Sequence, residues 1–546
     1  MVAWFRKINW LVVVILFLAV FLRVYRLDYL ELFGDELDAG YQSYSLMTIG
    51  RDYKGNLLPT YIHSFSEWRA PGLMYAMIPF VKVFGLNEFG VRGCCAFFGV
   101  LGILGFYFLL KSLEIEEKIN IVVMLFITIC PWHIQYSRAG FELTLLTSLL
   151  LWGAGFLVLG LKKNIYRLIV VSGVLLSLGF YTYNTANIYV PIIALITLAI
   201  FKANRKQCLT LFITGLLFSL PMIYQIFFGH AADRFGKFSV FSDEQVVVEM
   251  ARYREAAGNT LASRFFYNKY VIVGKKILFN YLNAFSPDFL FRNGDITFRH
   301  SLRQVGNLFW IMCPLMLLGL YTTIGKKNKT KADVWLLVLL LLSPVPSSLT
   351  VDGYNHASRL FLLLFPLMYF AGLGLTSLKR IWLVTIGCVL IFEFCNYQYY
   401  YWNFYRSESF RWWHFGYKQA MVYIADNSIR YDKILMDNTY EPSLIRFLFW
   451  NKVDPKNIFE ITDKMENNID GWGGFCIDKK NCFVDFGGRL ESGKMNSKVL
   501  YLISQERNVG GDWDWSKDPP NGIKTLRTIR DPEGLPLFYL IEKDEK

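Results

Sequence analysis

Long apolar runs separated by short polar loops fill the chain from its start to residue 402. The first run covers residues 8–22, and ten more that can cross about 30 Å of hydrocarbon lie at 91–111, 120–136, 142–160, 166–183, 187–201, 208–228, 304–323, 334–350, 359–377 and 381–401. The pattern predicts eleven membrane-spanning helices. No small-residue cleavage site follows the first run, and Arg23 and Arg26 come next. We therefore expect a retained span rather than a signal peptide.

The basic residues of the loops indicate how these spans are oriented. If the N-terminus is cytoplasmic, every cytoplasmic loop is basic, because these loops carry Lys111, Lys118, Lys162, Lys163, Arg167, Lys202, Arg205, Lys206, Lys326, Lys327, Lys329, Lys331, Lys379 and Arg380. This is the distribution that the positive-inside rule requires. With an odd number of spans, we expect the C-terminus on the outer side.

The chain changes character at about residue 403, where the long apolar runs stop. Short strand-like segments at 433–436, 498–503 and 537–541 alternate with polar loops, and residues 417–426 have a helical pattern. We therefore predict a transmembrane domain over 1–402 and a small soluble α/β domain outside the membrane over 403–546. Cys476 and Cys482 fall in this exported domain, and a disulfide and two free thiols both stay open.

Composition supports an α-helical polytopic membrane protein. Hydrophobic residues make up 54% of the chain, charged residues only 18%, and the mean hydropathy is +0.31. The net charge of +13 is spread over cytoplasmic loops that face anionic lipid, so it does not indicate nucleic-acid binding. No phosphate-binding glycine loop follows a strand, and the six histidines are scattered singly, so the sequence predicts neither a nucleotide cofactor nor a dedicated zinc site.

The most informative polar residues on the predicted outer side are Asp35 and Glu36, just after the first span. Adjacent side chains on a helix diverge by about 100°, so the two carboxylates cannot act as one pair. Separate roles are more natural, one as general base on a hydroxyl and the other orienting it or a sugar. The alternative is a capped amphipathic helix at the membrane interface. A divalent cation held by these carboxylates also stays open.

Three arginines on the outer side are candidates for binding a phosphate. Arg69 precedes a short apolar stretch at 73–84 that predicts an interfacial helix, where a guanidinium can hold a lipid phosphate or simply extend to the surface. Arg138 lies four residues before Glu142, so a phosphate contact and an internal salt bridge are both open. Arg359 starts a predicted span, where the helix dipole disfavours a cation and an anionic partner would relieve the mismatch.

Four further outer residues are candidates for substrate contacts. Tyr183 and Asn187 lie in an aromatic and amide cluster that suits a sugar, although tyrosines are also ordinary at a membrane interface. His300 lies in the longest outer loop, at 229–303, and His356 precedes Arg359. Two prolines at 344 and 346 break the preceding span, which proteins tolerate where backbone lines a cavity.

The order of these motifs resembles a known class of membrane enzyme. The sequence has Gly-Asp-Glu at 34–36, Arg-Ala-Pro-Gly-Leu-Met-Tyr at 69–75, Asn-Glu-Phe-Gly-Val-Arg at 87–92, Trp-His-Ile-Gln-Tyr-Ser-Arg at 132–138 and Ser-Pro-Asp-Phe-Leu at 286–290. Over residues 1–402 it is similar to GT-C class glycosyltransferases, close to the protein O-mannosyltransferases and the lipid A aminoarabinose transferase (glycosyltransferase family 39-like).

The resemblance implies an inverting transfer of sugar from a polyprenyl-phosphate donor to an acceptor hydroxyl at the outer face of a prokaryotic cell membrane. Asp35 would be the general base and Glu36 its neighbour. Arg69, one residue further from the proline than the matching lysine of the aminoarabinose enzymes, would contact the donor phosphate with Arg138 and Arg359. Substrate contacts are predicted at Glu142, Tyr183, Asn187, His300 and His356. The alternative is a lipid-linked sugar flippase or a solute transporter, although the sequence shows no internal repeat.

Overall fold

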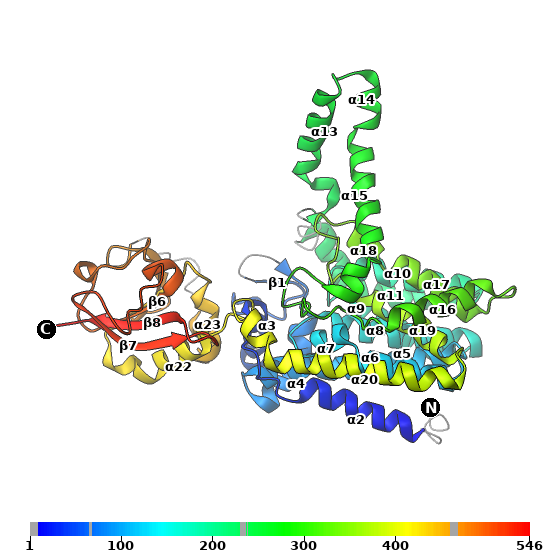
Figure 1. Cartoon of the computed structure of the whole chain (residues 1–546), viewed down its shortest axis with the longest axis horizontal. Coiled ribbons are helices and arrows are strands. Elements are labelled where there is room, and N and C mark those ends of the chain that lie inside the picture. Colours follow the sequence, from blue (N-terminus) through cyan, green and yellow to red (C-terminus); the bar gives the residue numbers. More distant parts are fainter. Residues whose placement is uncertain (1–8, 65–67, 230–235, 237, 459–467, 546) are drawn as a thin grey trace. The chain divides into compact units, whose positions relative to one another are not determined.

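The chain folds into two compact units (Figure 1). The computed structural model describes residues 9–64, 68–229, 236, 238–458 and 468–545. Unit 1 consists of Met1–Tyr25, Thr60–Leu73 and Cys95–Tyr401, and unit 2 consists of Arg26–Pro59, Met74–Cys94 and Trp402–Lys546. Unit 2 therefore combines the C-terminal residues with two segments that come much earlier in the chain.

Several helices have the length and composition of membrane spans. Within the described ranges, five qualify: α5 (Glu88–Ser112), α8 (Leu143–Lys163), α11 (Arg205–Phe228), the stretch Lys331–Ser348 and α20 (Arg380–Asn403). The stretch Lys331–Ser348 contains α17 (Lys331–Leu342) and α18 (Val345–Ser348). A sixth candidate is the pair α6 (Glu117–Ile129) and α7 (Pro131–Ser137), which is bent by 61°. The protein is thus mostly helical, with five or six clear candidate spans.

Shorter apolar helices of 10–17 residues occupy the remaining apolar runs. They are α2 (Trp10–Val24), α4 (Gly72–Phe84), α9 (Tyr166–Gly179), α10 (Ala186–Ile200), α16 (Met312–Gly325) and the continuous stretch Phe361–Thr376, which joins η3 (Phe361–Leu363) to α19 (Leu364–Thr376). Each of the eleven apolar runs overlaps one of these helices or helix pairs, although residues 304–311 of one run precede α16. The remaining helix of this list, α4, lies where the sequence predicts an interfacial helix.

Glycines allow close packing between helices of unit 1. A Cβ atom on Gly319 of α16 would collide with the carbonyl of Phe370 in α19, and one on Gly374 of α19 would collide with the carbonyl of Leu315 in α16. The two backbones therefore touch directly, as is common between helices in lipid. The break between α6 and α7 is explained by Pro131, which cannot continue the helical hydrogen bonds.

The long loop between α11 and α16 is folded rather than extended. It contains η1 (Val240–Ser242), α13 (Glu244–Ala256), α14 (Leu261–Phe266), α15 (Lys269–Asn283) and η2 (Asp288–Arg292). The side chains of Asp243, Thr260 and Asn268 cap the N-termini of α13, α14 and α15. These helices form a hairpin that stands away from the other helices of unit 1 (Figure 1). A short two-stranded pair, β1 (Ile62–His63) and β2 (Trp68–Arg69), also belongs to this unit.

The C-terminal part of unit 2 is built on a mixed six-stranded sheet in the order β4-β5-β3-β6-β8-β7. Its strands are β3 (Lys433–Asp437), β4 (Gly473–Cys476), β5 (Asn481–Asp485), β6 (Val499–Ser504), β7 (Ile523–Arg530) and β8 (Pro536–Lys543). β3 pairs in parallel with β5 and β6, and the other pairs are antiparallel. Leu435, Tyr501, Ile503, Tyr539 and Ile541 contribute to its core. This agrees with the α/β domain that the sequence predicts.

Helices and short turns complete unit 2. Besides most of α4 and the start of α5, the helices are α3 (Gly34–Ile49), α21 (Tyr405–Ser409), α22 (Tyr417–Asn427) and α23 (Ser443–Trp450). The short turns are η4 (Ser428–Arg430), η5 (Pro455–Asn457), η6 (Ser492–Lys494) and η7 (Gln505–Val509). The glycine-rich segment at 471–474 is a turn that leads into β4, because Asp470 and Gly471 both have positive φ.

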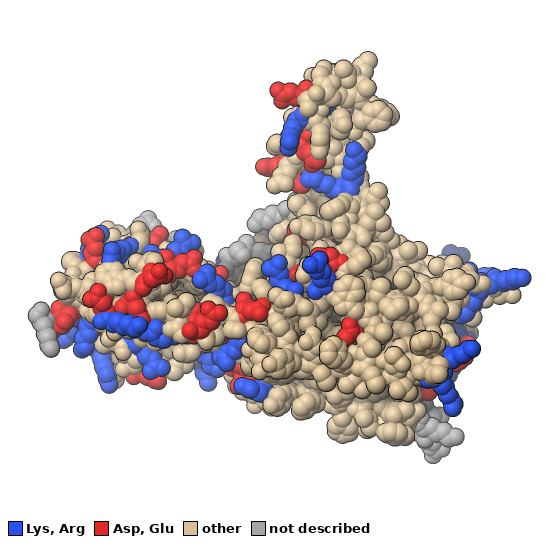
Figure 2. All heavy atoms as spheres, in the orientation of Figure 1, with Lys and Arg blue, Asp and Glu red and all other residues tan. Residues whose placement is uncertain are grey.

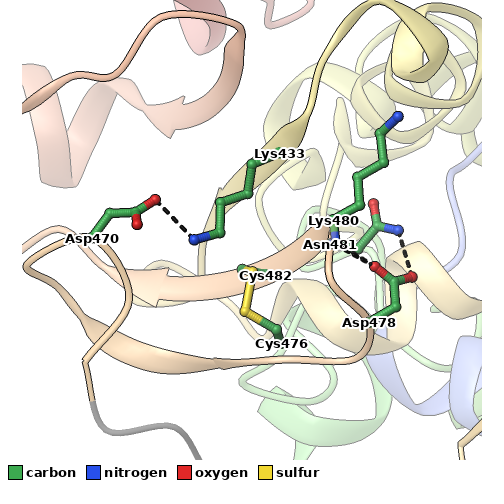
Figure 3. Close-up of a disulfide and its surroundings, with 7 residues drawn as sticks. All are labelled: Lys433, Asp470, Cys476, Asp478, Lys480, Asn481 and Cys482. Atoms are coloured by element: carbon green, nitrogen blue, oxygen red, sulfur yellow. Dashed lines mark hydrogen bonds and ion pairs between the residues drawn. A yellow bond between two sulfur atoms is a disulfide. The ribbon is translucent and has the colours of Figure 1, made fainter.

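A disulfide joins Cys476 of β4 to Cys482 of β5, which resolves the choice that the sequence leaves open (Figure 3). Asp478 closes the turn between these strands by accepting hydrogen bonds from the backbone N–H groups of Lys480 and Asn481, both at 2.7 Å. Nearby, Lys433 forms an ion pair of 2.9 Å with Asp470. The disulfide therefore fastens an edge hairpin that already has its own turn.

Candidate functional site

The two adjacent carboxylates at the start of α3 have different surroundings. Asp35 is exposed in the first turn of the helix, whereas Glu36 is fully buried. Glu36 Oε1 accepts a hydrogen bond of 2.7 Å from Arg92 Nε, and Oε2 accepts one of 2.7 Å from Arg92 Nη2. Oε2 also accepts from the backbone N–H of Phe33 at 3.2 Å. Glu36 is thus held in a two-pronged ion pair, and only Asp35 is presented to solvent.

Besides its ion pair with Glu36, Arg92 binds the loop before α3. Its remaining N–H groups donate to the carbonyls of Leu27 at 2.8 Å, Leu30 at 2.7 Å and Glu31 at 2.9 Å. All five donors of the guanidinium are therefore used. The side chains of Arg92 and Glu36 are both buried, so the pair fixes the backbone that leads to Asp35.

Residues of the C-terminal part pack against the same loop within unit 2. The backbone N–H of Gly34 donates to His414 Nδ1 at 3.2 Å, and Glu31 Oε2 accepts from the backbone N–H of Gly416 at 3.0 Å. Tyr41 of α3 donates to the carbonyl of Val453 at 2.9 Å. We call His414, Gly416, Lys418, Phe449 and Val453 the C-terminal clamp.

The clamp packs closely against α3, and it also buries Glu31 of the loop before α3. Lys418 forms an ion pair of 2.5 Å with Glu88, and a Cβ atom on Gly40 would collide with the ring of Phe449. Burial raises the pKa of Glu31 to about 7, although the N–H groups of Gly416 and Lys418 oppose this shift. The position of Asp35 therefore depends on residues that follow it by almost 400 positions.

In unit 1, Arg138 is a buried residue that binds the end of α2. Its Nη1 donates to the carbonyls of Leu22 at 3.1 Å and Tyr25 at 2.7 Å, and its Nε donates to the hydroxyl of Tyr401 at 3.1 Å. A cation at a helix C-terminus is electrostatically favourable. Arg138 thus has a clear structural role beside the phosphate contact that the sequence predicts. Glu142 lies at the N-cap of α8.

Arg359 lies in a polar cluster in front of η3 and α19. Its guanidinium binds both oxygens of Asp352, and Nη1 donates to Thr350 Oγ1 at 2.6 Å. It also has a side-chain hydrogen bond with Tyr183. The structure therefore brings two predicted site residues together, and Asp352 supplies an anionic partner for Arg359. Asn187 is exposed in the first turn of α10, and Arg69 lies in β2.

A second cluster in unit 1 joins His300 and His356 to Asp295. His300 Nδ1 lies 3.1 Å from Asp295 Oδ2, and the rings of the two histidines are 5.4 Å apart. Asp295 Oδ2 also accepts from the backbone N–H of Ala357 at 2.8 Å. The sequence did not predict Asp295, because its partner His356 is 61 residues away. A weak signal was its position five residues before His300.

The electrostatics of this cluster suit a cation. Burial alone would raise the pKa of Asp295, but His300 and His356 lower it below its ordinary range. Burial and the nearby charges of Arg359 and His300 lower the pKa of His356 to about 3. His356 Nδ1 is buried, with no hydrogen-bond partner among the described residues. One ligand atom from each of the three residues lies within 4.8 Å of the others, so they could hold a metal ion. The sequence predicted no such grouping.

The geometry also bears on the cation that the sequence leaves open at Asp35 and Glu36. Both Glu36 oxygens accept hydrogen bonds from Arg92. A cation there would have to displace a buried guanidinium of the same charge sign. Asp295, His300 and His356 offer the better ligands.

Comparison with known proteins identifies one family. Residues 69–226 match the profile of the family described as dolichyl-phosphate-mannose-protein mannosyltransferase. No curated protein matches the sequence.

Solved structures with a distant likeness to the chain include an oligosaccharyltransferase and ArnT. The Archaeoglobus fulgidus oligosaccharyltransferase in complex with zinc and sulfate has 13% identity and a TM-score of 0.48, and the match covers 81% of this chain and 61% of that protein. ArnT from Cupriavidus metallidurans bound to undecaprenyl phosphate has 13% identity and a TM-score of 0.48, and the match covers 97% of each chain. The chain thus spans less than two thirds of the oligosaccharyltransferase. Over residues 69–226 the chain is similar to the membrane glycosyltransferases of the dolichyl-phosphate-mannose-protein mannosyltransferase family.

Proposed function

We propose that the protein is a glycosyltransferase that moves a sugar from polyprenyl phosphate to a hydroxyl group of a protein, lipid or glycan acceptor. The family match over 69–226 supports the donor class. The observation that carries the chemistry is the contrast between the exposed carboxylate of Asp35 and the buried, fully bonded carboxylate of Glu36.

Asp35 is the general base in this proposal, and Glu36 is a positioning residue. Asp35 accepts the proton of the acceptor hydroxyl as its oxygen forms a bond to C1 of the sugar. The bond from C1 to the phosphate oxygen breaks in the same displacement, which inverts C1 and releases polyprenyl phosphate. Phosphate is already a good leaving group, so no protonated acid is needed. Glu36 never meets the substrate, because its ion pair with Arg92 only fixes the backbone before Asp35.

The donor phosphate is assigned to arginines of unit 1. Arg359 suits this role because a guanidinium can hold two phosphate oxygens at once, and the phosphate would replace the carboxylate of Asp352 that it now binds. Arg69 and Arg138 are the other proposed contacts. Glu142, Tyr183, Asn187, His300 and His356 are the proposed substrate contacts. Cations aimed at the leaving group stabilise charge that develops in the transition state.

The chain is proposed to have the GT-C architecture with eleven spans, the N-terminus in the cytoplasm and the sheet domain outside. Support comes from the overlap of all eleven apolar runs with helices, five or six of which have the length and composition of spans, and from the basic loops between alternate runs. A prokaryotic cell membrane is the proposed location.

A metal at Asp295, His300 and His356 is a separate part of the proposal. One carboxylate and two imidazoles form a donor set that suits zinc better than magnesium, which prefers oxygen ligands. A bound zinc ion would supply a Lewis acid, but the displacement described above does not require it.

The test is release of free polyprenyl phosphate by the purified protein, supplied with a panel of polyprenyl-phosphate sugars and crude envelope acceptors. Asp35→Asn should abolish release and leave donor binding nearly unchanged. Asp28→Asn is the matched control, since Asp28 is an exposed carboxylate of the same unit, seven residues earlier. Donor binding lost in Asp35→Asn, with turnover per bound donor unchanged, would contradict the assignment. Movement of the donor across the bilayer without release would favour the flippase alternative.

A further inference from the structure

The hairpin in the long loop of unit 1 has an uneven distribution of charge. The four acidic residues of α13 and its N-cap are Asp243, Glu244, Glu249 and Glu255. The segment from Leu261 to Asn283, which contains α14 and α15, has no acidic residue and four basic ones: Arg264, Lys269, Lys275 and Lys276. The second half of the hairpin therefore has a net charge of +4. Lys276 is compensated by its ion pair with Asp243, and Arg264, Lys269 and Lys275 are the residues complementary to an anionic surface.

The same segment exposes large apolar side chains. Leu261, Phe265, Phe266 and Tyr270, which surround the tip, are 85%, 71%, 60% and 87% exposed. Further along α15, Leu278, Phe279 and Leu282 are also exposed. Figure 2 shows a largely uncharged surface over the tip of the hairpin. A cluster of this size is unusual on a surface that faces only water.

The hairpin is nevertheless well folded. Val246 of α13 packs with Ile272 and Val273 of α15 in a small core. Lys276 forms an ion pair of 2.9 Å with Asp243, and Arg254 Nε donates to the carbonyl of Tyr267 at 2.9 Å. The exposed apolar residues are therefore not the inside of an unfinished fold. They form an outer face of a folded element.

We propose that the basic and apolar face of α14 and α15 binds the anionic lipid surface of the membrane that holds the protein. Aromatic and aliphatic side chains mixed with Lys and Arg are typical of helices that lie in the headgroup region. The hairpin belongs to the same unit as most of the candidate spans, so the membrane is a partner that is always present. This proposal does not depend on the proposed chemistry.

The base of the hairpin connects this surface to Arg359. Asn280 of α15 donates to the carbonyl of Thr350 at 2.9 Å, and the hydroxyl of Thr350 accepts from Arg359. The residue before η1 adds a second link, because Ser239 pairs with Thr350 in an isolated β-bridge. The base of the hairpin thus lies beside Arg359, a proposed donor-phosphate residue.

The test uses the full chain in vesicles with an environment-sensitive fluorophore on one cysteine. Cys208, Cys313, Cys388 and Cys395, which are not fully buried, are first changed to Ala. The reporter is Ala262→Cys in the exposed part of α14, and the matched control is Arg252→Cys on the charged face of α13. Vesicles contain phosphatidylcholine alone or mixed with phosphatidylglycerol, and a doxyl-labelled lipid serves as quencher.

With phosphatidylglycerol, the reporter at 262 should shift to the blue and be quenched by the doxyl lipid, whereas the reporter at 252 should keep the emission seen in water. Each basic residue near an anionic surface changes the partition coefficient between water and membrane about five-fold. The double variant Lys269→Glu with Lys275→Glu should therefore weaken binding of the hairpin to the vesicle surface at least about thirty-fold. Emission typical of water in both lipids, with the hairpin helices intact, would overturn the proposal. A blue shift that grows with protein density, and that neither the doxyl lipid nor the charge reversal affects, would also overturn it by indicating contact with a second copy.

Discussion

Removing the carboxylate of Glu36 should open the loop that carries Asp35. Glu36→Ala leaves the buried guanidinium of Arg92 with two unsatisfied donors and no counter-charge. Breaking a buried ion pair in this way costs about 3–5 kcal/mol, whereas an exposed pair is worth roughly 0–1 kcal/mol. At about 1.4 kcal/mol per factor of ten, the open form of the loop should become at least about a hundred times more populated.

Hydrogen exchange of residues 27–40, followed by mass spectrometry on the full chain, measures this opening directly. Glu491→Gln is the matched control, since its ion pair with Lys494 is long, at 3.7 Å, and exposed on both sides. Exchange at 27–40 should accelerate strongly in Glu36→Ala and remain unchanged in Glu491→Gln.

Removing both members of the ion pair should open the loop less than removing Glu36 alone. Arg92→Met combined with Glu36→Leu removes both charges, so no uncompensated ion remains, and part of the protection should return. Recovery should be incomplete, because the carbonyls of Leu27, Leu30 and Glu31 still lose their donor. Exchange in Glu36→Ala that equals the wild type would refute the idea that this pair holds the loop.

Three other predictions follow from the contacts described above. The pKa of Glu31 rises from 4.5 to about 7 in the folded protein, so its contribution to the stability of the clamp is full below pH 4.5 and is lost as the pH rises through 7. Proteolysis of the loop before α3 should therefore increase over that range, and Glu31→Gln should remove this pH dependence. The same pH profile in Glu31→Gln and in the wild type would contradict the prediction. Reducing the disulfide between Cys476 and Cys482, or changing both residues to Ala, should destabilise the sheet domain by about 2 kcal/mol, because the disulfide closes only a short loop. Calorimetry with and without reductant measures this loss of stability. A loss several times larger would contradict a role limited to closing this loop. The purified protein should contain one zinc ion per chain, as measured by mass spectrometry. His356→Ala should lose this zinc, and the control His63→Ala should retain it. Equal zinc content in both variants would refute the proposed metal site.

The helices of the chain could be predicted from its sequence, because each apolar run is a local pattern. The same holds for β3, β6, β8 and α22, which match the segments read from strand and helix periodicity. The hairpin of α13, α14 and α15 was not predicted, since its helices are short and partly polar and the segment resembles a loop.

The site was harder to predict because its contacts join distant residues. The separation of Asp35 from Glu36 into exposed and buried positions agrees with their divergence on a helix. The partner of Glu36 is 56 residues away, however, and no periodicity links it to Arg92. The same holds for Asp295 and His356, which meet only because the loop after η2 and the loop before η3 lie together in the fold. Residue types indicated the chemistry, but only the fold identified the partners.

The C-terminal clamp has a consequence for how the protein is made. The loop before α3 leaves the ribosome early, but its hydrogen-bond partners come much later in the chain. Tyr29 is separated from Trp402 by 373 positions, and Gly34 is separated from His414 by 380 positions. Ten predicted spans must be inserted in between. The loop with Asp35 therefore lacks its C-terminal partners until the sheet domain has been synthesised and has folded. Activity should appear only after synthesis ends, and a nascent chain inserted up to residue 401 should be inactive although all of its spans are in place.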